Sequence, residues 1–317
     1  MAEIFAMNNK RYNIGLDAGS TTLKLVATDG NGNIVYTDYQ RHYADISGTL
    51  QSSLVRMREK MGDVEVSFCA TGSAGMGISE RFGLPFIQEV VAATRVVEVK
   101  YPETKTLIDI GGEDSKMIFF NQDMQPDIRM NGNCAGGTGA FIDQMAAILS
   151  VDVSEMSNLA LNAQTTYPIA SRCGVFSKTD IQNLIALNVS RENIAASIFN
   201  AVVTQVISAL SHGCDIKPKI FLCGGPFAFI PVLKQILMEK LSVSESDIIL
   251  DPNASVIPSW GASLSIPENN ESLPIETYIK IFSEKKEKIK LNRSDLEPLF
   301  KNETSYHNWV AEKESDK

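Results

Sequence analysis

The sequence contains the same strand–turn–strand pattern twice, and this repetition limits the folds that the chain can adopt. The first copy is YNIGLDAGSTTLKLVATD, in which an apolar strand ends at Asp17 and a glycine-rich turn leads into a second β-rich strand. The second copy is TLIDIGGEDSKMIFF, in which Asp109 lies at the end of the apolar strand and a glycine pair follows. The likeness of residues 14–25 to residues 108–119 predicts two similar half-folds in tandem. Helical segments alternate with the strands, so we expect an α/β fold.

The overall composition is that of a globular protein with an acidic balance of charge. The 317 residues carry a formal net charge of −9, and 44% of them are hydrophobic, which allows a substantial core. The acidic balance argues against nonspecific nucleic-acid binding, which requires clustered Lys and Arg. No apolar run approaches the roughly 20 residues that span a bilayer, and residues 1–12 do not resemble a secretory signal. We therefore expect a cytoplasmic protein with no nucleic-acid or membrane partner.

The remaining segments predict helices and a third glycine turn. In KIFLCGGP, a buried strand ends at the pair Gly224 and Gly225. In SKTDIQNLIAL, Ser177 and Asp180 have the spacing of a capping box, which predicts a helix start at Ser177. Apolar residues recur at helical spacing in residues 48–61, 86–102, 192–213 and 232–241.

The chain is expected to have three parts. Residues 11–101 form the first half and residues 102–266 form the second half. After Pro267 the sequence becomes polar and charged with scattered apolar residues, so residues 267–317 are expected to be a tail or linker, in part helical. A chain that ends in this way is consistent with a piece of a longer protein.

The Asp-Gly turns have the chemistry of a phosphate site. Glycine lets the backbone approach a phosphate closely, and exposed N–H groups bind its oxygens. An Asp at the end of each strand can hold Mg²⁺ or a metal-bound water. Each turn alone could be an ordinary loop, but two at matching places, with a third glycine pair later, favour a nucleotide cleft.

The order DAGST, ATGS, DIGGED, CGGP resembles the superfamily of actin, the sugar kinases and the heat-shock ATPases, over roughly residues 11–266. The resemblance implies that ATP binds between two α/β domains, each built on a mixed five-stranded sheet. It implies that Asp17 and Asp109 organise Mg²⁺ and water. Glu113 is a candidate for an added carboxylate that orients water. The other implied nucleotide contacts are Gly19, Ser20, Thr21, Gly111 and Gly112 at the phosphates, and Gly224 and Gly225 at the adenosine. Lys24 and Lys116 either neutralise phosphate or are simply exposed on their strands.

Two cysteines lie just before expected helix starts, Cys134 in GNCAGGTGAF and Cys173 in ASRCGVFSKTD. The partial positive charge of a helix N-terminus lowers a thiol pKa and stabilises an anion. The placement suits a thiolate nucleophile or the ligands of an iron–sulfur cluster, and the plain alternative is two unreactive core thiols. A cubane cluster usually takes four thiolates, which a symmetric dimer supplies. Cys69 and Cys223 lie in apolar strands and are expected to pack as small hydrophobes, and Cys214 has no evident partner.

The segments CAGGTGAF and CGVF resemble those of the ATP-dependent activators of 2-hydroxyacyl-CoA dehydratases and the related ATPase subunits of benzoyl-CoA reductase. The resemblance implies a 4Fe–4S cluster held by Cys134 and Cys173 of both subunits of a homodimer. It also implies ATP-driven transfer of one electron to a dehydratase or reductase component. The segment GGPFAFIP and the charged tail look more like the activase region of large fused proteins, a resemblance that implies a partner component fused in a longer chain.

Two other classes of function fit the same fold. A small-molecule kinase would use an Asp as the base on a bound hydroxyl and would not need the paired cysteines. A non-catalytic interaction module would bind nucleotide without hydrolysing it or carrying iron. A Cys134→Ser substitution distinguishes these classes, because only an electron donor would lose its activity.

Overall fold

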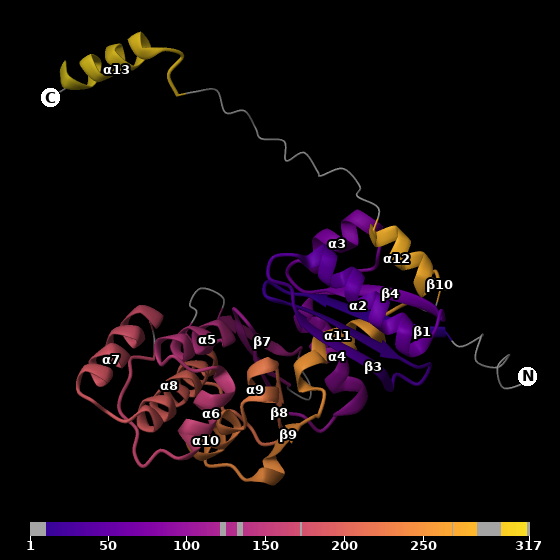
Figure 1. Ribbon diagram of the computed structural model, residues 1–317, viewed down its shortest axis with the longest axis horizontal. Coiled ribbons are helices and arrows are strands. Elements are labelled where there is room, and N and C mark those ends of the chain that lie inside the picture. The colour runs from indigo at the N-terminus through magenta and orange to yellow at the C-terminus, as the bar shows by residue number, and fades with distance from the viewer. Residues whose placement is uncertain are drawn as a thin grey trace, which may run out of the picture. The chain divides into compact units, whose positions relative to one another are not determined.

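The computed structural model describes residues 11–120, 125–131, 136–171, 173–267, 269–283 and 299–315. The chain divides into two compact units, of which the first ends at Ser283 and contains both sheets (Figure 1). The second contains α13 (Glu303–Ser315), where the Phe300 ring packs against the rings of Tyr306 and Trp309.

The first half of the larger unit is built on a five-stranded sheet with the order β10-β4-β1-β2-β3. β1 pairs with β2 antiparallel and with β4 in parallel. Six of the seven residues of both β2 and β4 are buried, because helices cover both faces of the sheet centre. The strands are β1 (Arg11–Ala18), β2 (Thr22–Thr28), β3 (Ile34–Arg41), β4 (Glu65–Thr71) and β10 (Leu273–Pro274), and the first two helices are α2 (Ile46–Met61) and α3 (Gly75–Phe82).

The second half repeats this arrangement with the order β9-β8-β5-β6-β7. β5 pairs with β6 antiparallel and with β8 in parallel, as β1 pairs with β2 and β4. The two similar half-folds expected from the sequence are therefore present. The strands are β5 (Thr106–Ile110), β6 (Ser115–Phe119), β7 (Asp127–Asn131), β8 (Ile220–Cys223) and β9 (Ile248–Leu250). The helices are α5 (Gly139–Ile148), α6 (Val153–Leu161), α7 (Gly174–Ala186), α8 (Arg191–Ser211), α9 (Gly225–Phe229) and α10 (Pro231–Leu241), with 3₁₀ turns at Glu245–Asp247 and Ala254–Val256.

Helix α8 forms the centre of the second half. Its start is capped by Ser190, whose side chain accepts a hydrogen bond from the backbone N–H of Asn193. Among the described residues it is the one helix long and apolar enough to cross a membrane, and 67% of the relevant window is buried inside the protein. That burial accounts for its apolar composition, since a core helix that is packed on most sides needs little polar surface.

Two helices, α4 (Glu89–Lys100) and α11 (Ile257–Leu264), join the halves. Their apolar residues belong to one buried cluster that also takes Val26 from the first sheet and Leu107, Ile118 and Phe221 from the second. α4 and α11 cross closely, since a Cβ on Gly261 would lie 1.8 Å from the Ala92 carbonyl oxygen. Within the described residues, this crossing is therefore where the two sheets share a core.

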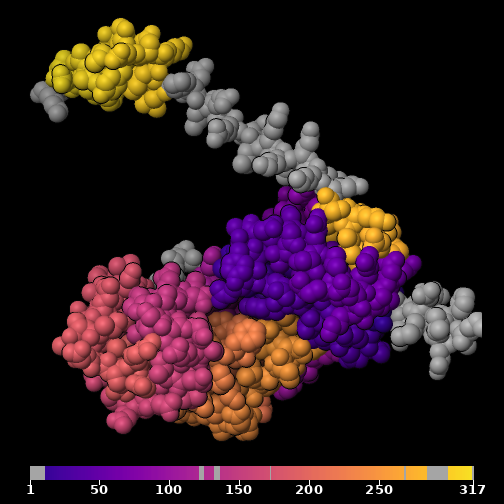
Figure 2. All heavy atoms as spheres, in the orientation of Figure 1, coloured from indigo at the N-terminus to yellow at the C-terminus, as the bar shows by residue number. Residues whose placement is uncertain are grey.

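The chain returns to the first half at α11, before residue 266, where the second half was expected to end. The side chain of Ser259 in α11 donates a hydrogen bond to the Gly15 carbonyl of β1 at 2.6 Å, so this helix lies on the first sheet although the boundary was expected at residue 266. Beyond it, β10 pairs with β4, and α12 (Ile275–Ser283) buries Ile275, Tyr278 and Phe282 against the first core. In Figure 2 the yellow-orange residues of α12 lie against the violet surface of the first half. Residues 273–283 are thus part of the fold and not of a tail, because their apolar side chains complete its core.

The helix crossing predicts opposite effects for two glycine-to-alanine substitutions. Gly261→Ala should lower the free energy of unfolding by about 2–3 kcal/mol, because the new methyl group overlaps the backbone of α4. Gly77→Ala, in helix α3 with open space around the glycine, should raise it by about 0.5–1 kcal/mol. Urea unfolding followed by circular dichroism measures both, and equal effects of the two substitutions would contradict the close crossing.

Candidate functional site

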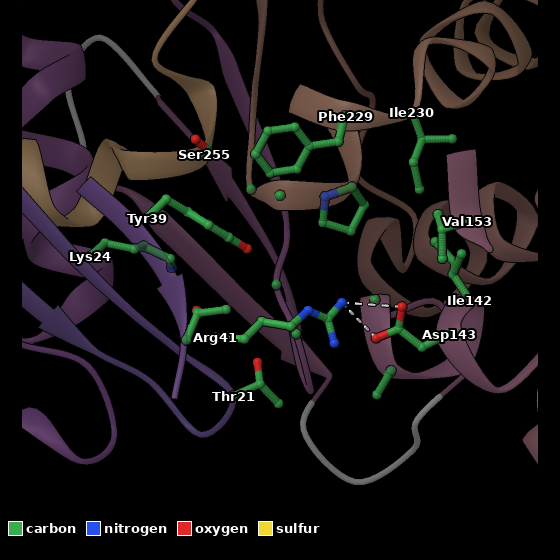
Figure 3. A pocket seen from close by; sticks show the side chains of 18 of the residues that line it. Thr21, Lys24, Tyr39, Arg41, Ile142, Asp143, Val153, Phe229, Ile230 and Ser255 are labelled. Carbon is green, nitrogen blue, oxygen red and sulfur yellow. Dashed lines mark hydrogen bonds and ion pairs between the residues drawn. The ribbon is translucent and has the colours of Figure 1, made fainter. Parts of the chain in front are cut away.

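The two halves enclose a cavity of about 290 Å³. Residues of β2, β3 and α4 form one wall, and residues of α5, α6 and α9 form another (Figure 3). Six of the residues predicted to bind nucleotide line it: Thr21, Asp109, Gly111, Gly112, Gly224 and Gly225. Asp17, Gly19, Ser20 and Glu113 do not line the cavity, and Glu113 is exposed. The structure thus brings together glycine turns that are far apart in the sequence.

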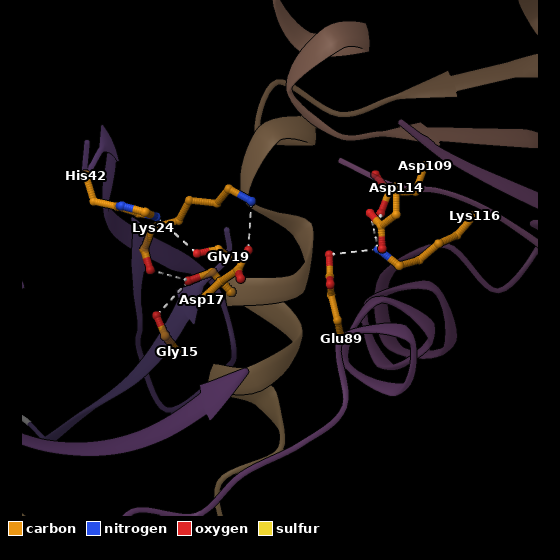
Figure 4. A network of polar contacts seen from close by, with 10 residues as sticks. Gly15, Asp17, Gly19, Lys24, His42, Glu89, Asp109, Asp114 and Lys116 are labelled. Atoms are coloured by element: carbon orange, nitrogen blue, oxygen red, sulfur yellow. Dashed lines mark hydrogen bonds and ion pairs between the residues drawn. The ribbon is translucent and has the colours of Figure 1, made fainter. Parts of the chain in front are cut away.

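Each sheet carries a buried Asp opposite a Lys on the neighbouring strand. Asp17 of β1 stands opposite Lys24 of β2, and their side chains form an ion pair of 2.8 Å. Asp109 of β5 stands opposite Lys116 of β6, with 3.7 Å between the charged atoms. Figure 4 shows the two pairs, one from each half. The alternative that the strand lysines are simply exposed is therefore wrong.

Both lysines remain charged in spite of their burial. Burial alone lowers the pKa of a lysine, but the charge and hydrogen bond of Asp17, together with the charge of Glu89, outweigh it and raise the pKa of Lys24. The pKa of Lys116 is raised in the same way by Asp109, with help from Glu89 at 3.1 Å and Asp114 at 3.0 Å. Each half therefore holds a fixed positive charge beside its carboxylate, which suits a site for phosphate and a divalent cation.

Glu89 is a functional candidate that the sequence analysis did not identify. It is the first residue of α4, lines the cavity and points toward Lys116 (Figure 4). Burial raises its pKa to about 7, and the negative charges of Asp17 and Asp109 act in the same direction. Burial also raises the pKa of Asp109, against the opposing effect of Lys116. This clustering of carboxylates stores repulsion that a bound cation would relieve.

Gly224 follows β8, and the close approach of β5 leaves no room there for a side chain. Gly224 has φ of +97°, and a Cβ there would lie 2.0 Å from the Ile110 carbonyl oxygen and 2.6 Å from a carboxylate oxygen of Asp109. Gly72, at the matching place after β4, has φ of +89° and would place a Cβ 2.4 Å from Asp17. In both halves, therefore, the strand beside the Asp must end in a residue without a side chain.

The turn at Gly111 and Gly112, which is the predicted phosphate loop of the second half, is joined to α5 through the backbone. The N–H groups of Gly139 and Ala140 donate to the carbonyl oxygens of Gly111 and Gly112, at 2.9 and 2.8 Å. The side chain of Thr138 caps the helix, which begins at Gly139 as expected. A displacement of the loop must therefore move the start of α5.

Cys173 lies where the sequence placed it, at the N-cap of α7, and is a half-buried free thiol. Cys134 lies outside the described residues. Gly136 is the first described residue after it, and a Cβ on Gly174 would lie 3.9 Å from the Gly136 backbone nitrogen. The segment that follows Cys134 therefore reaches the start of α7.

The helix after Cys173 begins three residues earlier than the capping-box pattern predicted. Ser177 lies within α7 and its hydroxyl donates to the Ala170 and Cys173 carbonyls, while Asp180 accepts from the Ala170 N–H at 2.8 Å. The capping box is therefore wrong, because these two side chains fold back on the preceding segment. Their contacts fix the backbone that carries the Cys173 thiol.

The other cysteines behave mostly as expected. Cys69 and Cys223 are buried, and burial raises the pKa of Cys69 to about 11. Cys214, which had no evident partner in the sequence, accepts a hydrogen bond from Arg129 at 2.9 Å. Within the described ranges, no group of three or more His, Cys, Asp or Glu side chains could hold a metal ion.

Two contacts among the described residues join β3 to the opposite wall of the cavity, and no sequence pattern predicts either of them. The Tyr39 ring of β3 meets the Phe229 ring of α9 edge to face, 5.4 Å between centroids. Arg41 of β3 forms an ion pair with Asp143 of α5 at 2.9 Å. No local pattern marks these residues, because each pair is brought together only when the two halves meet.

The two matching sheets and the cavity between them have the arrangement of the actin and sugar-kinase fold class, as expected. The sequence is more specific. Residues 14–265 match the BadF/BadG/BcrA/BcrD ATPase family, and the chain belongs to that family. The expected resemblance is therefore confirmed.

Named relatives agree with this assignment. The 2-hydroxyisocaproyl-CoA dehydratase activator of Clostridioides difficile is 33% identical over 223 residues, which are 68% of this chain and 80% of that protein. The solved structure of the activator of the 2-hydroxyisocaproyl-CoA dehydratase from Clostridium difficile with bound ADPNP has a TM-score of 0.70 at 30% identity, over 80% of this chain and 93% of the other. Component A of the (R)-2-hydroxyglutaryl-CoA dehydratase of Acidaminococcus fermentans has a TM-score of 0.71 at 27% identity, over 80% and 96%.

The raised pKa of Glu89 predicts a pH dependence of stability. The folded state holds this proton up to about pH 7, whereas the unfolded state loses it near the usual 4.5. Between these values the folded state binds more protons, so the free energy of unfolding should fall as the pH rises and level off above 7. Glu89→Gln removes this titration, and its stability relative to the parent protein should increase by about 1–2 kcal/mol from pH 5 to pH 8.

Denaturation midpoints at four pH values test this expectation. Glu98→Gln is the matched control, since Glu98 is exposed and pairs only loosely with Arg95 at 3.5 Å. Parallel pH profiles for the parent protein and Glu89→Gln would show that Glu89 titrates normally.

Proposed function

We propose that this protein is an ATP-hydrolysing one-electron donor that activates a 2-hydroxyacyl-CoA dehydratase or a related reductase. Membership in the ATPase family and the likeness to named dehydratase activators support the nucleotide-dependent part. One observation carries the electron-transfer part: the start of α7, where Cys173 lies, is close to Gly136. Gly136 comes just before α5, the helix that is hydrogen-bonded to the phosphate loop.

The cleft residues fit Mg²⁺-ATP. Asp109 is almost fully buried and lines the cavity, so its carboxylate can bind Mg²⁺ directly or through water while the nucleotide phosphates supply the other oxygen ligands. The backbone at Gly111 and Gly112 faces the same space and can donate to phosphate oxygens. Asp17 does not line the cavity, but its ion pair with Lys24 keeps that lysine charged at the cavity wall.

Cys173 fits a cluster ligand. It caps a helix, has no side-chain hydrogen bond in that role, and is partly accessible, so its thiolate would face free N–H groups. With Cys134 each subunit offers two thiolates, so a 4Fe–4S cluster would lie between two copies of the chain. Such a cluster, when bound, accepts and donates single electrons. Val175 and Phe176 follow Cys173 with 72% and 65% of their surfaces exposed, which supplies apolar area for the second subunit.

The two sites are coupled through α5. A nucleotide that draws Gly111 and Gly112 toward its phosphates pulls on Gly139 and Ala140, and through them on the segment that contains Cys134. Gly136, which follows that segment, lies against Gly174 at the start of α7. Binding and hydrolysis would then shift both helix starts, which is the rearrangement that makes transfer to the partner favourable. By linkage, the dehydratase or reductase component should in turn change nucleotide affinity.

The iron content of the protein tests the proposed cluster. Anaerobically prepared or reconstituted protein should contain about four iron and four acid-labile sulfide per dimer. Cys173→Ser and Cys134→Ser should each lose the cluster and the ATP-dependent reduction of the partner, because two of four ligands disappear from every dimer. Cys214→Ser is the control, since that thiol is also half-buried but is held by Arg129.

The outcome also separates the competing functions. Reconstituted protein that stays free of iron yet hydrolyses ATP would rule out the electron-donor function and direct attention to hydroxyl substrates of a kinase. Protein that binds nucleotide without turnover or iron would be an interaction module.

A further inference from the structure

Arg41 and Asp143 form an ion pair that bridges the two halves at the cavity. The guanidinium of Arg41, at the end of β3, lies 2.9 and 3.2 Å from the two carboxylate oxygens of Asp143 in α5 (Figure 3). Both side chains line the cavity, and they remain 52% and 39% exposed. The hydrogen bond that Arg41 donates to Asp143 is the main cause of the raised pKa of Arg41, which is charged at any physiological pH.

Each member of this pair is joined to a different phosphate loop. His42 is next to Arg41, and its backbone N–H donates to the Thr21 carbonyl at 3.2 Å. The Nε2 atom of its ring lies 3.1 Å from the Gly19 carbonyl oxygen. Asp143 lies one turn along α5 from Gly139, which is bonded to Gly111. The pair therefore connects the DAGST turn to the DIGG turn across the space between them.

The charges around the cavity leave a role for Arg41. The lining side chains include two cations, Lys24 and Arg41, and three carboxylates, those of Glu89, Asp109 and Asp143. Lys24 is bound to the buried Asp17 and cannot leave it without stranding a charge. Arg41 is half-exposed and its pair costs little to break, since exposed ion pairs contribute only about 0.2–1 kcal/mol. It is the lining cation that is able to turn toward an anion.

We propose that Arg41 is a nucleotide-binding residue that exchanges Asp143 for the terminal phosphates. This inference rests on the proposed function, because it assumes that ATP enters this cavity. A guanidinium binds carboxylate and phosphate with the same two-pronged geometry, so Asp143 occupies the donors that the phosphate needs. When the nucleotide takes Arg41, the contact between β3 and α5 is lost. Asp143 thus competes with the ligand, and α5 is released from the first half as the cleft fills.

The exchange predicts opposite effects for the two members of the pair. Arg41→Ala should weaken the binding of Mg²⁺-ADPNP about tenfold or more, and should weaken Mg²⁺-ADP less, because the terminal phosphate is missing. Asp143→Asn should tighten Mg²⁺-ADPNP about two- to fivefold, because the competitor for Arg41 is removed while the side-chain shape is kept. In the Arg41→Ala background, Asp143→Asn should have no further effect.

Equilibrium titration of the full chain with each nucleotide measures these changes. Arg95→Ala is the matched control, because Arg95 is 49% exposed and pairs with Glu98 away from the cavity. Arg41→Lys keeps the charge without the two-pronged fork and should recover only part of the affinity. Urea midpoints confirm that each variant is folded, and Arg41→Lys serves in place of Arg41→Ala if the latter does not fold.

Each alternative has its own result. Unchanged affinity in Arg41→Ala, or weaker binding in Asp143→Asn, would overturn the exchange, since Asp143 would then be a spectator, a ligand of the metal or a support for Arg41. Parent protein that binds no nucleotide would overturn the proposed function itself. Normal binding by the parent protein with no response in the variants would overturn the exchange alone.

Discussion

The crossing of α4 and α11 is the constraint on which the rest of the molecule depends. The two sheets share one apolar cluster, and it is formed around these helices. At Gly261 the helices approach to a distance that leaves no room for a side chain, and Ser259 of the same helix is bonded to β1. The crossing holds the carboxyl ends of both central strands at one cavity, and it carries Glu89 there as the first residue of α4. Without this crossing, Lys24 of one Asp–Lys pair and Asp109 of the other would not line one cavity.

Much of the fold could be predicted from the sequence because its information is local. The strand–turn–strand copies that end at Asp17 and Asp109 fold as paired hairpins in matching sheets, as expected. Cys173 lies at a helix start for the same reason, since glycine and polar residues precede an apolar helical pattern. Gly224 and Gly225 also line the cavity, because they follow a strand that pairs in parallel with β5 and so lie at the same edge of the sheet.

The remaining features depend on contacts between distant segments. Lys24 and Lys116 look like exposed strand residues in the sequence, and their burial follows from the helices that cover each sheet. In the sequence, the apolar positions of α12 resemble those of a solvated tail. Their burial follows from the pairing of β10 with β4, a strand that lies more than 200 residues earlier in the chain. Ser177 has the spacing of a cap but bonds backward to Ala170, because the helix start is set by Cys173 and Gly174. Arg41 and Asp143 have no shared motif, since they belong to different halves.

The joint between the phosphate loop and α5 is made by main-chain atoms alone, Gly139 to Gly111 and Ala140 to Gly112. Substitution of side chains on the outer faces of α5 or α7 therefore leaves the connection intact. Substitutions at the exposed Val175 and Phe176 would change the surface that another protein meets, while this main-chain joint stays the same. The architecture thus separates a joint that does not depend on side-chain identity from a surface whose chemistry is set by side chains.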